Sequence, residues 1–275
     1  MSELDAIQGS EHPNTVKSLA ADLAAIGVQP GMTLIVHSSL SKLGWVAGGP
    51  VAVVYALERA IGHGGTLVMP AHSSDLSDPS EWQNPPVPEV WWDVIRDTMP
   101  AYDPDLTPSR GMGAIPECFR KQRGVLRSSH PQVSFAAWGK HAETITRAHP
   151  LANSLGDESP LARIYDLDGW VLLLGVGHGN NTSLHLAEYR AAWPGKSVVT
   201  LGAPVLVEGD QQWVTFEDIN IDTGDFPMLG EAFAATGAVR AGTVGRAPSL
   251  LMRQRALVDF AVEWMAANRT ASGEN

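Results

Sequence analysis

The stretch VLLLGVGHGNNTSLHLAEYRAA, residues 171–192, decides how this chain is expected to fold. Residues 171–174 form an apolar run with the length and composition of a buried strand. A glycine-rich turn follows, and Asn181 or Thr182 then supplies an N-cap oxygen for a helix. A buried strand that leads through a short turn into a helix predicts an α/β protein.

The first turn of this expected helix contains His185, and Glu188 lies three residues later on the same helix face. Ligands of open α/β sheets bind in the crevice outside the carboxyl ends of the strands. A histidine at that place, oriented by a carboxylate, is a candidate general base. The dipole at a helix N-terminus favours the neutral imidazole that a base needs. The same pattern also fits a structural histidine on an amphipathic helix, and both interpretations stay open.

The composition is that of a globular enzyme and excludes several partners. Of the 275 residues, 44% are hydrophobic and 18% charged. The formal net charge of −11 argues against nucleic acid, which needs a basic face, and is compatible with a cationic small molecule. A single cysteine, Cys118, excludes an intrachain disulfide and a cysteine zinc cluster. Without a secretion signal or an apolar run near the ~20 residues of a membrane span, a cytoplasmic protein without a membrane partner is expected.

Apolar periodicity predicts four elements within the first 70 residues. They are a helix over 15–26, a strand over 32–36, a helix over 51–61 and a strand over 66–69. The order strand, helix, strand predicts a right-handed crossover. No linker, repeat or low-complexity segment divides the chain, so we expect one domain over residues 1–275.

A serine-rich turn follows the first predicted strand, and a glycine pair precedes the next helix. Backbone N–H groups in such turns bind phosphates. The pattern matches neither a Walker loop nor GxGxxG, and it equally fits a tight loop with a helix cap. The residues concerned are His37, Ser38, Ser39, Leu40, Ser41, Gly48 and Gly49.

A proline- and tryptophan-rich excursion occupies residues 71–110 and includes Asp75. Aromatic rings with carboxylates between them suit a sugar-like or cationic ligand, and they equally suit the packing of a lid. A solvated acidic edge, or a wall that binds an amine, is expected around Glu217 and Asp218.

Two further predictions concern the second half of the chain. Short strands at 198–201, 203–207 and 212–216, with a hairpin turn at 208–210, predict a small antiparallel extension of the sheet. A C-terminal helix is predicted over residues 249–267.

The chemistry that remains is proton transfer by an imidazole. No GxSxG elbow supports an acyl-serine. The spacing of His178, His185 and Glu188 matches no zinc signature, and no metal is expected. A neutral imidazole would then deprotonate an amine that attacks a thioester. Two alternatives stay open: a metal-dependent amide or ester hydrolase that uses these three residues, and a non-catalytic binder of cationic small molecules.

Five segments in a fixed order resemble the aminoglycoside 3-N-acetyltransferase family. The likeness runs from about residue 13 to residue 265. The segments are LIVHSSLSKLGWVAGGP (34–50), GTLVMP (65–70), SSHPQVSFAAWG (128–139), ESPLARIYDLDGWVLLLGVGH (158–178) and NTSLHLAE (181–188).

The resemblance implies a three-layer α/β/α sandwich with a mixed, mainly parallel central sheet and a small antiparallel extension. It implies transfer of acetyl from acetyl-CoA, as cosubstrate, to the 3-amino group of a 2-deoxystreptamine aminoglycoside, giving antibiotic resistance. We expect a monomer or homodimer. Members similar to this family act on other amines, so acylation of another amine is the alternative.

The same resemblance assigns roles to residues. It implies that His185 is the general base and that Glu188 supports it. It implies that the turn at 37–41 and the pair Gly48 and Gly49 contact coenzyme A. It further implies that Asp75, Glu217 and Asp218 face the ammonium groups of the antibiotic.

Overall fold

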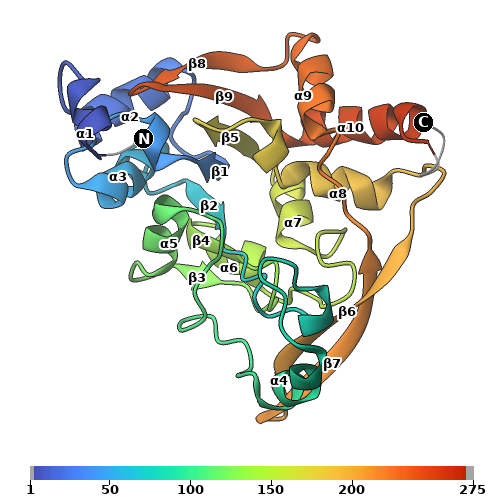
Figure 1. Cartoon of the computed structure of the whole chain (residues 1–275). Coiled ribbons are helices and arrows are strands. Elements are labelled where there is room, and N and C mark those ends of the chain that lie inside the picture. Colours follow the sequence, from blue (N-terminus) through green and yellow to red (C-terminus); the bar gives the residue numbers. More distant parts are fainter. Residues whose placement is uncertain (1–2, 271–275) are drawn as a thin grey trace.

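A seven-stranded sheet crosses the middle of the molecule in the order β3-β4-β2-β1-β5-β9-β8 (Figure 1). The computed structural model describes residues 3–270. Strand β1 (Thr33–Ser38) pairs in parallel with β2 (Thr66–Pro70) on one side and with β5 (Trp170–Leu174) on the other. The predicted crossover and the strand of the central stretch are thereby confirmed.

The outer strands of this sheet are antiparallel to their neighbours. On one side of the centre lie β4 (Phe135–Gly139) and β3 (Leu126–Arg127), and on the other lie β9 (Ala247–Arg253) and β8 (Arg240–Val244). The sheet is therefore mixed, as expected, but parallel pairing is limited to its three central strands.

Helices cover both faces of the sheet and give the expected three layers. Because strand side chains alternate, Leu34 and Val36 of β1 face one core while Ile35 faces the other. The first core is closed by α2 (Val16–Ala25), α3 (Gly49–Ile61) and α5 (Ala114–Arg120). The second is closed by α6 (Ala142–Thr146), α7 (Pro160–Asp166), α8 (Ser183–Arg190), α9 (Phe226–Ala234) and α10 (Gln254–Asn268).

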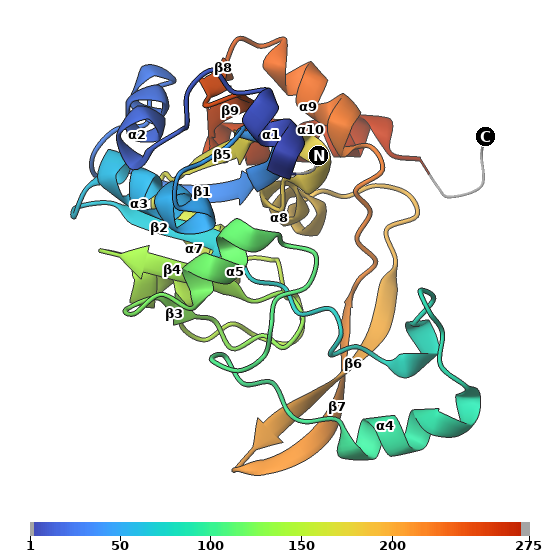
Figure 2. The same ribbon diagram turned by 60° about the vertical axis from the view of Figure 1, so that its left-hand side comes forward.

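The antiparallel element is a separate hairpin rather than a continuation of the sheet. Strands β6 (Val198–Val207) and β7 (Asp210–Ile219) pair only with each other. Both turn residues, Glu208 and Gly209, have positive φ, which matches the twist of a tight hairpin. The hairpin projects away from the sheet, and α4 (Trp92–Thr98) of the long excursion lies beside it (Figure 2).

The prediction of a helix from residue 249 is wrong for its first five residues. Residues 249–253 belong to β9, which lies between β5 and β8, and α10 begins only at Gln254. Leu251 and Met252 are fully buried because they face the two cores on opposite sides of the sheet. An apolar run that is buried on both faces is typical of an inner strand.

The remaining described elements are short. They are α1 (Glu3–Gln8), η1 (Leu40–Lys42), η2 (Pro79–Glu81), η3 (Glu89–Trp91) and η4 (His178–Asn180). Within residues 3–270, no helix has both the length and the apolar content that crossing a bilayer requires.

Candidate active site

The carboxyl ends of β1 and β5 bring the serine-rich turn and helix α8 together. His37 and Ser38 of β1 stand opposite Leu173 and Leu174 of β5. The backbone N–H of Ser39 donates to the carbonyl of Leu174 over 2.9 Å. The chain leaves β5 at Gly175 and reaches α8 within a few residues, so α8 starts beside the end of β1. The strand-end crevice predicted from the sequence is therefore formed.

Thr182 is the N-cap of α8, but its side chain does not cap the helix. The carboxamide oxygen of Asn181 instead accepts a hydrogen bond from the N–H of Ser183 over 3.3 Å. The Thr182 hydroxyl turns toward the ring of His37, whose Nε2 lies 3.3 Å away. Both residues predicted as alternative N-caps therefore take part in the start of α8. Thr182 occupies the N-cap position, and Asn181 supplies the side-chain oxygen.

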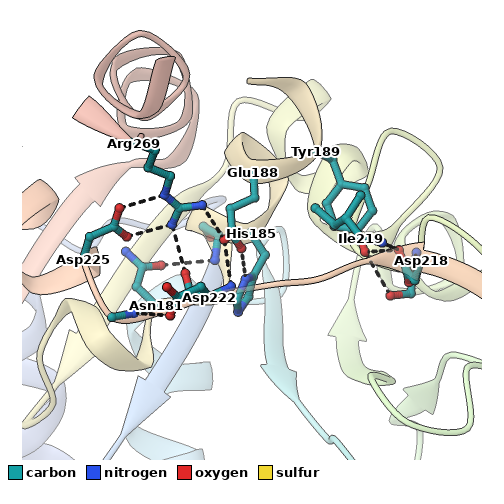
Figure 3. Close-up of polar contacts among 12 residues, drawn as sticks. Asn181, His185, Glu188, Tyr189, Asp218, Ile219, Asp222, Asp225 and Arg269 are labelled. Carbon is teal, nitrogen blue, oxygen red and sulfur yellow. Dashed lines mark hydrogen bonds and ion pairs between the residues drawn. The ribbon is translucent and has the colours of Figure 1, made fainter. Parts of the chain in front are cut away.

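His185 and Glu188 form a buried pair on α8 (Figure 3). The Nδ1–H of His185 donates to Oε2 of Glu188 over 2.5 Å, and the two residues are 6% and 0% exposed. A carboxylate only accepts hydrogen bonds, so the ring proton lies on Nδ1 and Nε2 carries the free lone pair. Among the described residues no hydrogen bond reaches that Nε2. The predicted pair on one helix face is therefore present and has the geometry of an oriented base.

The second oxygen of Glu188 is held by two further donors. Its Oε1 accepts from Nη1 of Arg269 over 2.7 Å and from the backbone N–H of Asp222 over 3.0 Å. A fully buried carboxylate stays ionised only when it is paired and hydrogen-bonded. Arg269 and the backbone of Asp222 provide this pairing and hydrogen bonding, from two segments that are distant from Glu188 in the sequence.

Two more histidines, His37 and His72, lie within electrostatic range of His185. Burial first, and the charge of a protonated His185 second, lower the pKa of His37 to about 3. Burial and the same neighbour, followed by smaller contributions from His37, His130 and Arg127, lower the pKa of His72 to about 3. Both rings are therefore neutral near neutral pH, and neither adds a positive charge beside His185.

Two cavities lie along the helix that carries the dyad. One of about 90 Å³ is lined by His37, Ser38 and Thr182, among others. Another of about 300 Å³ is lined by His72 and Asp218, among others. Thr182 at the start of α8 lines the smaller cavity, and Tyr189, next to Glu188, lines the larger one, so both cavities adjoin the helix of the dyad. The arrangement brings two cavities close to one candidate base.

The residues predicted to contact coenzyme A are only partly gathered here. Ser38 lines the smaller cavity, and its buried hydroxyl has no hydrogen-bond partner among the described residues. The hydroxyls of Ser39 and Ser41 lie 3.2 Å apart in an exposed contact, on either side of Leu40. Neither cavity includes these three residues, nor Gly48 and Gly49, which lie at the start of α3 with positive φ.

Of the three acidic residues predicted to face the substrate, only Asp218 lies by the dyad. It is 4% exposed and accepts from the Tyr189 hydroxyl over 2.5 Å and from the N–H of Ser154 over 3.1 Å. Glu217 is exposed, on the opposite face of β7. Asp75 is half-exposed, forms a 2.6 Å ion pair with Arg110, and lines a third cavity of about 320 Å³ in the excursion.

The three-residue metal site weighed as an alternative is not formed. His178 is buried, and its ring packs so tightly on Gly230 that a Cβ there would lie 2.1 Å from it. Glu188 is occupied by His185 and Arg269. Within residues 3–270, no three His, Cys, Asp or Glu side chains are placed to hold one metal ion.

Sequence reasoning missed several residues of this site. Arg269 and Asp222 are 81 and 34 residues away from Glu188 in the sequence, yet both donate hydrogen bonds to it. No local sequence pattern predicts such contacts. Tyr189 had a usable signal, since it follows Glu188 in the helix that carries the dyad. Burial and its hydrogen bond to Asp218 raise the pKa of Tyr189, so it is a neutral donor.

Comparison with known proteins places this geometry in a family. The family model described as aminoglycoside 3-N-acetyltransferase matches residues 35–266. The SPbeta prophage-derived aminoglycoside N(3')-acetyltransferase-like protein YokD of Bacillus subtilis (strain 168) is 46% identical over 263 residues, 95% of this chain and 96% of YokD. Aminoglycoside N(3)-acetyltransferase VII of Streptomyces paromomycinus is 39% identical over 281 residues, 96% of each chain.

Solved structures share the fold. The crystal structure of YokD from Bacillus subtilis superposes with a TM-score of 0.94 at 45% identity, covering 96% of this chain and 98% of YokD. A structure of AAC-IIIb with CoASH gives 0.84 at 33% identity, covering 96% and 100% of the two chains. A structure of AAC-VIa bound to sisomicin gives 0.86 at 32% identity, covering 94% and 100%. Sequence, fold and family match therefore agree that this chain belongs to the aminoglycoside 3-N-acetyltransferase family.

Proposed function

We propose that this protein transfers an acetyl group from acetyl-CoA directly to the 3-amino group of a 2-deoxystreptamine aminoglycoside and so confers antibiotic resistance. The observation that carries the proposal is the buried pair of His185 and Glu188, with no hydrogen bond to Nε2 of the ring among the described residues, on a helix that two cavities adjoin. The CoASH held by AAC-IIIb and the sisomicin held by AAC-VIa support the two substrates.

His185 is the general base in this proposal. The amine attacks in its uncharged form, after one proton has been lost to solvent. As its nitrogen bonds to the acetyl carbon, Nε2 of His185 takes a second proton from it. The carbon–sulfur bond then breaks, and the departing thiolate receives that proton, which leaves the amide and free coenzyme A. Glu188 stabilises the imidazolium formed in between, because its Oε2 accepts the Nδ1–H.

The smaller cavity suits the thioester. Ser38 presents a buried hydroxyl without a protein partner, which is free to donate to an oxygen atom. A donor aimed at the acetyl carbonyl stabilises the negative charge that develops there during attack. We assign the acetyl end of acetyl-CoA to this cavity and extend the cosubstrate along Ser39, Leu40 and Ser41 toward Gly48 and Gly49.

The larger cavity suits the amine. Asp218 in its lining supplies a negative charge, and the formal charge of −11 draws cations toward the protein. A charge-assisted hydrogen bond to an ammonium group contributes about 1.5–3 kcal/mol. Asp75 and Glu217 lie outside this cavity, and we keep them as contacts for more distant parts of the drug.

Acetylation of a different amine is the second candidate. It is favoured by YokD, which is 46% identical and carries the name of an acetyltransferase-like protein. The same dyad and the same thioester cavity would serve, with a different occupant beside Asp218.

A panel of amines decides between these functions. Purified protein is incubated with acetyl-CoA and either aminoglycosides that carry a 3-amino group, close analogues without it, or unrelated amines. Thiol release and the product mass are recorded. The proposal predicts one added acetyl group only where the 3-amino group is present. Acetylation of other amines alone supports the second candidate, and binding without any product supports sequestration instead.

A further inference from the structure

The guanidinium of Arg269 is held on every side, immediately after the end of α10 (Figure 3). Its Nε and Nη2 donate to the two oxygens of Asp225, each over 2.7 Å. Nη2 also donates to the carbonyl of Asp222 over 2.9 Å, and Nη1 donates to Oε1 of Glu188 over 2.7 Å. One side chain therefore joins the end of α10, the segment before α9 and the dyad.

Two aromatic rings lie against this guanidinium. Its central carbon lies 4.8 Å from the ring centre of Trp193 and 6.0 Å from that of Phe226. The ring of Phe226 also packs on His185, at 5.0 Å between centroids. The Arg269 side chain is only 10% exposed, so its contacts with Glu188 are poorly screened by water.

The charges around Glu188 make Arg269 its principal cation. Burial opposes the charge of Arg269, but hydrogen bonds to Asp225 and Glu188 outweigh that effect and raise its pKa. Lys196 also acts on Glu188 through its charge, while its ammonium donates to the carbonyls of Tyr189 and Ala191. The side chain of Asp222 accepts from the N–H of Gly224, and His37 and His72 are neutral.

We infer that Arg269 is a positioning residue for the base: it holds Oε1 of Glu188 so that Oε2 stays directed at Nδ1 of His185. Rotation of the carboxylate away from His185 would break the contact between Arg269 and Oε1 and leave a buried charge unpaired, which is costly. The ring of His185 is thereby kept with its proton on Nδ1 and its lone pair on Nε2. Arg269 lies just beyond the matched residues 35–266.

The shape of the side chain matters as well as its charge. Arginine presents donors in a planar fork, whereas lysine is a point charge on a flexible stem. Only the fork bonds Asp225 through two donors and Glu188 through a third. We therefore expect Arg269→Lys to retain part of the effect and Arg269→Gln to lose it.

The first test is spectroscopic and independent of catalysis. The ring nitrogens and the Nδ1–H of His185 are followed by NMR against pH in the wild type, Arg269→Gln and Arg269→Lys. Without the donor that holds Oε1, the Glu188 carboxylate is free to turn, and this weakens or broadens the Nδ1–H signal of His185. The control is Arg255→Gln on α10, since Arg255 donates to the backbone carbonyls of Tyr165 and Asp166 and lies against the Tyr165 ring rather than Glu188.

The second test is kinetic and rests on the proposed function. Misplacing a catalytic group by about 1 Å costs up to about 10²-fold in rate. Arg269→Gln should therefore lower kcat by roughly 10- to 100-fold with a nearly constant KM for both substrates. The kcat of Arg269→Lys should fall between those of Arg269→Gln and the wild type.

The outcomes of the two tests distinguish failure of this inference from failure of the proposed function. If the His185 signals in folded Arg269→Gln match those of the wild type and of Arg255→Gln, the inference is overturned, whatever the enzyme acetylates. If the signals change as expected but no amine is acetylated by the wild type, the positioning role stands and the proposed function fails. Should Arg269→Gln not fold, Arg269→Lys decides by the same signals.

Discussion

The hydroxyl of Tyr189 lies 2.5 Å from Oδ1 of Asp218 and joins the helix of the dyad to the projecting hairpin. Tyr189 follows Glu188 directly in α8, whereas Asp218 belongs to β7. Both residues line the larger cavity. The wall to which we assign the amine is thus tied to the element that carries the base.

Asp218→Asn should therefore weaken amine binding. Loss of the charge removes a charge-assisted contact of about 1.5–3 kcal/mol, so we expect KM for the aminoglycoside to rise by roughly 10-fold or more. Steady-state kinetics at saturating acetyl-CoA measures it. Asp210→Asn is the matched control, since Asp210 is exposed at the other end of the same strand. Equal effects of the two substitutions would remove Asp218 from the amine site.

Ser38→Ala tests the thioester cavity. The hydroxyl has no protein partner among the described residues, so its removal should leave the melting temperature unchanged. Loss of a donor to the developing oxyanion costs about 10²–10³-fold in kcat. Ser39→Ala, which removes an exposed hydroxyl, should cost less. A normal kcat for Ser38→Ala would show that this hydroxyl does not reach the reacting carbonyl.

The buried histidines should make stability depend on pH. Burial lowers the pKa of His37 and of His72 to about 3, below the ordinary value of 6.5. The unfolded chain therefore binds more protons between these values, and the free energy of unfolding falls as pH drops from about 6.5 toward 3. The melting temperature should fall by about 5 °C or more between pH 7 and pH 4.5. An unchanged melting temperature over that range would contradict the burial of these rings.

Gly230→Ala tests whether His178 has a structural role. The added Cβ would lie 2.1 Å from the His178 ring, so α9 must shift away from it. Such overpacking costs about 1–3 kcal/mol of unfolding free energy, measured by denaturant titration. Gly179→Ala is the control, because its Cβ would lie 3.9 Å from the nearest atom, on Pro227. Similar stabilities for the two variants would show that His178 and Gly230 are not closely packed.

Local patterns in the sequence predict the centre of this site and miss its surroundings for a physical reason. His185 and Glu188 are three residues apart on one helix, so helical periodicity alone brings them together. The contacts of Arg269 with Glu188, and of Asp218 with Tyr189, join segments that only the folded chain brings together. From charge and composition alone, an acidic segment such as the one at Asp218 is expected to be a solvated edge. Contacts between distant segments produce no periodic pattern in the sequence that would indicate otherwise.

The errors in the secondary structure predicted from the sequence have similar causes. Separate strands are predicted at 198–201 and 203–207, but β6 (Val198–Val207) runs through Gly202, against which the indole of Trp213 packs. The apolar run at residues 249–253 is followed directly by an amphipathic helix, and its sequence pattern therefore predicts one continuous helix. Burial on both faces, which separates the two, becomes visible only when β5 and β8 are in place.

The central claim is that His185 removes the proton from the attacking amine. Its most direct measurement is the kcat of His185→Ala for thiol release from acetyl-CoA in the presence of an accepted aminoglycoside, with the affinity for coenzyme A measured in parallel. The account predicts a fall of about 10²–10⁴ in kcat with unchanged coenzyme A binding. A variant that folds, binds coenzyme A and turns over at the wild-type rate would contradict it.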